Sequence, residues 1–186
     1  MKKTLIATVC LALVAGLSSV TAAETMKGDL SKTLMDASMS AKQKMEAIES
    51  YVEHVEKGAA TLTRKEEMLA KDSLKDATDE TWTKMHAYFD GKDLKRMKLY
   101  PGENSTKTEE FYFYNNEPVF AFVEKNGKGK ENHDKDAVGS KYYFVDGKLI
   151  EAIDADGKMM DVKSADAEKM GAKLHKESTA LRGMLK

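Results

Sequence analysis

Two stretches of this chain, 112–128 and 142–158, repeat one pattern at a spacing of 30 residues without a gap. Each stretch contains an aromatic run, a short polar turn, an apolar run and then a Gly-Lys pair. This order of residue types is typical of a β-hairpin, and an internal repeat constrains a fold more than any single motif does. A shorter third copy, 88–94, precedes them. The repeat therefore predicts an antiparallel sheet built from successive hairpins.

The Asp-Gly pair at 146–147 sets the register predicted for the later hairpin, because Asp-Gly favours a two-residue turn. Phe144 then lies opposite Leu149, and the same register places Phe113 opposite Phe120 in the earlier copy. Residues directly opposite each other share a face of the sheet. The predicted phenylalanine face contains Phe111, Phe113, Phe120, Phe122, Tyr143, Ile150 and Ala152. The predicted tyrosine face contains Tyr112, Tyr114, Val119, Ala121, Tyr142, Phe144, Leu149 and Glu151.

The two faces differ in chemistry. Phenylalanine has no polar group, so we expect the phenylalanine face to lie beneath helices, where burying each ring contributes about 1.5–3 kcal/mol. Tyrosine joins an apolar ring to a hydroxyl, which favours a half-exposed surface or a binding groove. The candidate binding residues are therefore Tyr112, Tyr114, Tyr142 and Phe144. On this hypothesis, replacing the three tyrosines with serine leaves the fold intact and abolishes capture of a partner.

Pro118 leaves a second register open for the earlier hairpin. Proline has no amide hydrogen with which to close a two-residue turn, so 115–118 could form a longer turn. A slip of one residue in the pairing would exchange the two faces. The exposure of Phe113 and Phe120 distinguishes the two registers.

Two amphipathic helices are predicted outside the hairpins. Ser40 and Gln43 match a capping box, in which each side chain satisfies a backbone amide at a helix start. Apolar residues recur every three or four positions from there to Gly58, which predicts a helix over 41–57. A second stripe predicts a C-terminal helix after 161–164; it consists of Ala167, Met170, Leu174, Leu181 and Leu185.

The predicted fold class is α+β. Six strands are expected, at 82–89, 94–100, 108–114, 119–125, 141–145 and 148–155. They form a six-stranded antiparallel β-meander built from hairpin repeats (82–158), packed on its phenylalanine face by an N-terminal and a C-terminal amphipathic helix. Residues 60–80 have no decisive pattern, since an extended 60–65 competes with a short helix over 66–74.

The first 23 residues predict export. Lys2 and Lys3 precede an uncharged apolar run over 5–20, and small residues follow where a signal peptidase would cut. The run is shorter than the roughly 20 strongly apolar residues of a spanning helix. We expect a cleaved signal peptide (1–23), a loose lead-in (24–39) and one domain (40–186), with no transmembrane segment after cleavage. The periplasm is the expected location, with secretion as the alternative.

No pattern of residues predicts an enzyme. The single cysteine, Cys10, lies in the signal peptide, so thiol catalysis and disulfides are excluded after cleavage. The four histidines are dispersed, and no catalytic or cofactor motif surrounds them. A nearly balanced charge, −1 for the whole chain, argues against nucleic acid as a partner. No catalytic residues, metal ligands or cofactors are assigned.

Metal handling is the first alternative to a binding protein. The chain has 12 methionines, and thioether ligands suit Cu(I) in periplasmic carriers. Most of them, however, fall where core residues are expected. The Asp-Ala-Asp-Gly run at 154–157 resembles part of a calcium loop, but Ala152 and Lys163 occupy the first and twelfth ligand positions. An enzyme of unrecognised type is the second alternative.

The hairpin at 142–150 resembles those of small exported bacterial proteins of uncharacterised function, many of them lipoproteins. It is also similar in kind to the aromatic and Gly-Lys hairpins of MORN-type β-meander proteins. The resemblance covers about 82–158 and implies a meander, but no active site. Together with the tyrosine face, it leads us to expect a non-enzymatic periplasmic protein that binds an unidentified ligand or protein partner.

Overall fold

The computed structural model describes residues 30–70, 73–74, 76–78, 80–102, 107–124 and 138–185; the predicted signal peptide lies outside them. Residues 30–35 are helical. The elements that follow are α2 (Ala41–Lys57), a 3-10 turn (Ala59–Thr61), β1 (Thr63–Met68), β2 (Trp82–Asp90), β3 (Asp93–Pro101), β4 (Thr108–Tyr114), β5 (Glu117–Glu124), β6 (Gly139–Val145), β7 (Lys148–Ile153) and α3 (Ala165–Met184).

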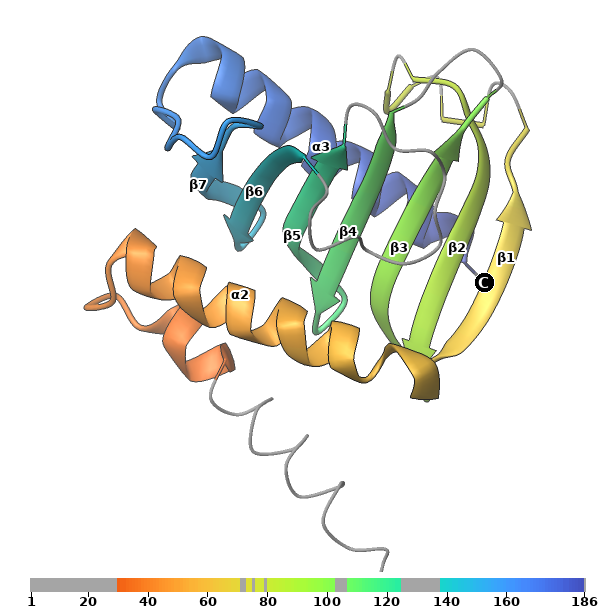
Figure 1. Ribbon diagram of the computed structural model, residues 1–186, viewed down its shortest axis with the longest axis horizontal. Helices are drawn as coiled ribbons and strands as arrows, with labels where there is room; N and C mark the ends of the chain where they lie inside the picture. The colour runs from red at the N-terminus through yellow and green to blue at the C-terminus, as the bar shows by residue number, and fades with distance from the viewer. Residues whose placement is uncertain are drawn as a thin grey trace, which may run out of the picture.

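The strands form one antiparallel sheet in chain order from β1 to β7, so the predicted α+β meander is confirmed, with seven strands instead of six (Figure 1). The additional strand is β1, which pairs with β2 through Thr63↔Phe89 to Met68↔Lys84. Its six residues are all exposed and four are charged, so no alternation of apolar and polar residues marks it. The short helix considered over 66–74 is wrong at 66–68, which belong to β1.

The repeat forms three hairpins with two-residue turns. Asn115 and Asn116 both have positive φ, as do Asp146 and Gly147, which is the backbone of a type I′ turn. The third copy, 88–94, turns at Gly91, whose φ is +60°. The two-residue turn predicted at 146–147 is therefore confirmed, and the longer turn considered at 115–118 does not form.

All three hairpins carry a one-residue bulge at the same place, which was not predicted. Two residue pairs form beyond each turn, and the next residue of the second strand is then left out of the pairing. The omitted residues are Lys95, Val119 and Ile150. The turns at 115–116 and 146–147 lie 31 residues apart, so Tyr112 and Tyr143 occupy equivalent positions and the structural spacing of the last two copies is 31 residues, not 30.

The bulges overturn the predicted faces. Phe113 lies opposite Pro118 and not Phe120, which lies opposite Tyr112. One face of the sheet collects Phe111, Phe113, Ala121, Tyr142, Phe144 and Ala152. The other collects Tyr112, Tyr114, Val119, Phe120, Phe122 and Tyr143. Each observed face mixes residues of both predicted faces, because a slip of one residue reverses the direction of every later side chain.

The two helices cover opposite faces of the sheet, not one face together (Figure 1). Ile48, Tyr51 and Val55 of α2 pack on the face of Tyr112, which we call the α2 face. A stripe of α3 at a spacing of seven residues packs on the face of Phe111, which we call the α3 face; it consists of Ala167, Leu174 and Leu181. The sheet is therefore the central layer of three.

Helix α2 begins where its sequence predicts. The capping box at the start of α2 is confirmed, since the Gln43 amide donates to Ser40 Oγ and the Ser40 amide donates to Gln43 Oε1. Ladder pairing between β3 and β4 ends at Tyr112, and the next carbonyl, that of Phe113, accepts a hydrogen bond of 2.5 Å from Tyr51 Oη. This buried bond fixes α2 against the centre of the sheet.

Candidate functional site

The four residues predicted as a binding surface do not form one. Tyr112 and Tyr114 lie beneath α2, whereas Tyr142 and Phe144 lie on the α3 face. Their exposed fractions are 0%, 6%, 5% and 1%, so all four belong to the two cores. The prediction of a half-exposed tyrosine face is wrong because both faces of the sheet are covered.

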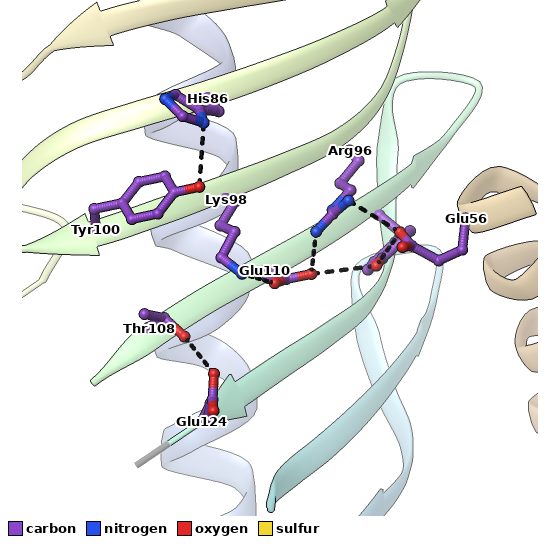
Figure 2. Close-up of polar contacts among 9 residues, drawn as sticks. Glu56, His86, Arg96, Lys98, Tyr100, Thr108, Glu110 and Glu124 are labelled. Atoms are coloured by element: carbon purple, nitrogen blue, oxygen red, sulfur yellow. Dashed lines mark hydrogen bonds and ion pairs between the residues drawn. The ribbon is translucent and has the colours of Figure 1, made fainter. Parts of the chain in front are cut away.

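Beyond the helix, the α2 face carries mostly buried polar side chains on β2 to β4 and the exposed Glu66 on β1, and we call this part of the sheet the polar half-face (Figure 2). The ladder registers align its side chains in rows across neighbouring strands. One such row is Glu66, His86, Lys98 and Glu110. Its residues vary in charge from strand to strand, an arrangement in which cross-strand neighbours attract each other.

Glu110 is the centre of this network, and only 1% of it is exposed. Its Oε1 lies 2.6 Å from Lys98 Nζ, and its Oε2 lies 2.9 Å from an Arg96 Nη. The other Arg96 Nη lies 3.2 Å from Oε1 of Glu56 on α2, to which Tyr112 Oη also donates. Two buried cations and two carboxylates therefore compensate each other and attach α2 to β3 and β4 (Figure 2).

A second chain of hydrogen bonds runs through His86, which is fully buried. Tyr100 Oη lies 3.1 Å from His86 Nδ1, and Glu66 Oε2 lies 2.8 Å from His86 Nε2. A tautomer with hydrogen on Nε2 satisfies both contacts, because Tyr100 donates to Nδ1 and Nε2 donates to Glu66. Burial lowers the pKa of His86, and the hydrogen bond from His86 lowers the pKa of Glu66. His86 therefore attaches β1 to the sheet as a neutral side chain.

The two edges of the sheet differ in accessibility. The chain after β7 turns back along it, with the Met160 amide donating to the Ala152 carbonyl at 2.9 Å and an isolated bridge between Ile153 and Met159. In contrast, every residue of β1 is exposed, and Met68 is 73% exposed. Strand β1 is thus an open edge, with backbone donors and acceptors available to another strand.

A surface hollow of about 480 Å³ lies between α3 and residues 76–78. It is lined by Asp76, Ala77, Thr78, Asp166, Lys169, Met170, Lys173 and Lys176. Both signs of charge line it, and Lys173 contacts Glu80 at 3.4 Å. The lining is therefore not specific for one class of ligand.

The described residues contain no group of three or more histidine, cysteine or acidic side chains placed to hold a metal ion. Met85 and Met97 are fully buried in the core, whereas Met35, Met68, Met159 and Met184 are exposed. The Asp154 carboxylate accepts 2.9 Å hydrogen bonds from the amides of Asp156 and Lys158, as in a turn. Among the same described residues, no helix has the length and apolar character needed to cross a membrane.

Comparison with known proteins identifies no relative: no protein-family model, no curated protein and no solved structure matches this chain. Its site must therefore be judged from its own geometry. Sequence reasoning missed the polar half-face and the open edge. The only sequence signal for the half-face is the alternation of charged and apolar residues along β3, which is equally typical of an exposed strand.

Proposed function

We propose that this protein is an exported, non-enzymatic protein of the cell envelope that binds a protein partner by adding a strand to β1. The observation that carries the proposal is the contrast between the two edges, since β1 is exposed along its whole length and β7 is partly covered. An exposed strand edge is a template for pairing with another chain. The apolar N-terminal run supports export.

The ladder identifies the backbone groups that a partner would use. The Leu69 amide donates to the Thr83 carbonyl at 2.9 Å, in line with the register of β1 and β2. Hydrogen-bonded and non-hydrogen-bonded pairs alternate along an antiparallel ladder. The amides and carbonyls of Glu66 and Met68 therefore point away from β2. Two donors and two acceptors are presented at the edge.

The side chains of β1 favour a different protein over a second copy of this chain. In a two-fold antiparallel pair of identical strands, one residue must lie opposite its own copy. Every position from 64 to 67 is charged, so a pair centred on β1 places like charges together. A complementary partner is an extended segment with acidic residues opposite Arg64 and Lys65 and basic residues opposite Glu66 and Glu67.

Proline substitution at an outward-facing position tests this proposal. Met68→Pro removes one outward amide hydrogen but no ladder bond to β2, so stability should change by about 0.5 kcal/mol or less. We expect the wild type and the matched control Met68→Ala to capture the same protein from a periplasmic extract, and Met68→Pro to lose it. Equal capture by all three proteins, or capture by none, would refute strand addition at β1.

A further inference from the structure

Two carboxyl groups meet beneath α3, away from the open edge. Glu109 belongs to β4 and Glu177 to α3, and both have an exposed fraction of 0%. The register of β3 and β4 places Glu109 opposite Leu99, on the α3 face. Each carboxyl group is therefore enclosed between the helix and the sheet, where an unpaired negative charge is strongly disfavoured.

The described residues supply too few donors for two carboxylates. Trp82 Nε1 donates to one oxygen of Glu177, and Lys107 Nζ lies 2.6 Å from Oε1 of Glu109. The remaining oxygens, Glu109 Oε2 and Glu177 Oε2, have no hydrogen-bond donor among these residues. A proton held between the two carboxyl groups supplies the missing donor.

The charges around the two carboxyl groups also indicate that one proton is bound there. Lys107 lies 2.8 Å from Glu80, and Lys173 of α3 lies 3.4 Å from the same carboxylate oxygen. Among the described residues, two lysines thus balance Glu80 and Glu109, and this group of side chains is neutral only when Glu177 is protonated. A further titratable neighbour in the described part of the chain is Tyr142 of β6, whose pKa is raised by burial. Burial and the nearby Glu109 raise the pKa of Glu177 from 4.5 to about 8.

We propose that Glu109 and Glu177 form a buried proton-binding site that makes the packing of α3 on the sheet sensitive to pH. One proton is bound at neutral pH and is lost in mildly alkaline solution. Its loss leaves two adjacent buried carboxylates, which repel each other and loosen α3. An exported protein meets the pH of its surroundings, so this site links its structure to that pH.

The direction of the pH dependence follows from proton linkage. The unfolded chain releases the Glu177 proton near the ordinary pKa of 4.5, whereas the folded chain retains it up to about 8. The folded state therefore binds more protons between these values, and stability falls as pH rises through this window. Uptake of one full proton on folding changes the folding equilibrium constant about tenfold per pH unit.

Urea unfolding of the signal-free chain between pH 5 and pH 9 tests the proposal. We expect the wild type to lose stability with rising pH and Glu177→Gln to lose much less, because glutamine supplies a donor without a titrating proton. Glu168→Gln, an exposed substitution on the same helix, should follow the wild type. The same slope in the wild type and in Glu177→Gln would overturn the proposal.

Trp82 provides a second measurement, because it is the only tryptophan and donates directly to Glu177. We expect its fluorescence in the folded wild type to titrate near pH 8, and this transition to be absent in Glu177→Gln. Glu109→Gln should likewise remove the transition, which keeps the test decisive if one variant fails to fold. Persistence of the transition in both variants, or its absence from the wild type, would contradict a shared proton.

Discussion

Replacing Glu110 with glutamine should reduce the free energy of unfolding by about 3–5 kcal/mol, the cost typical of breaking a buried ion pair from one side. Glutamine keeps the size of the side chain, so the loss is electrostatic. Without the carboxylate, Lys98 and Arg96 are buried side by side, at 2% and 3% exposure, and Glu56 is the one carboxylate among the described residues left to compensate them. Chemical unfolding at neutral pH measures the loss.

Two variants identify the cause of this effect. Glu67→Gln, a substitution of the same type on the exposed strand β1, should change stability by about 0.5 kcal/mol or less. Adding Lys98→Met to Glu110→Gln should recover part of the loss, because Arg96 keeps its 3.2 Å contact with Glu56. Similar effects of Glu110→Gln and Glu67→Gln would show that the network contributes little.

Replacing Tyr112, Tyr114 and Tyr142 together with serine should unfold the domain. Truncating one large buried aromatic side chain costs about 3–5 kcal/mol, and a typical domain has only about 5–15 kcal/mol of stability. All three residues are buried, one on the α3 face and two on the α2 face. Circular dichroism and urea unfolding report the outcome. The sequence alone predicted the opposite result, namely that this triple variant keeps its fold.

The matched control replaces the same tyrosines with phenylalanine. The rings then remain, and the main losses are hydroxyl hydrogen bonds, such as the 2.7 Å bond from Tyr112 to Glu56, worth about 1 kcal/mol each. We expect this variant to fold. A triple serine variant as stable as the wild type would support the hypothesis of an exposed tyrosine surface and contradict the described packing.

The local elements of this fold were predictable because their signals lie close together in the sequence. The Asp-Gly turn at 146–147, the capping box at Ser40 and Gln43, and the stripe of α3 each depend on residues within one or two turns. The side-chain faces were not predictable, since one omitted residue per hairpin reverses the direction of all that follow. Nothing in the residue types of Val119 or Ile150 indicates a bulge.

The burial of polar residues in the sheet could not be predicted from the sequence, for a different reason. A charged residue in a strand normally indicates a solvent-facing position, so Glu110 and Glu109 would both be assigned to the surface. Their burial depends on residues far away in the chain: Arg96 joins Glu110 to Glu56 of α2, and Glu177 of α3 lies against Glu109. Local patterns do not link these residues. Strand β1 was not predicted because its residues show no alternation of apolar and polar side chains. Its charged residues are typical of an edge strand.

Amide hydrogen exchange along β1, measured residue by residue by NMR in the signal-free protein, tests the open edge most directly. We predict alternation: the amides of Lys65 and Glu67 are protected by β2, whereas those of Glu66 and Met68 exchange nearly as fast as unstructured amides. A bound strand should then protect these two. Protection of Glu66 and Met68 in the isolated protein, or no alternation at all, would contradict the account.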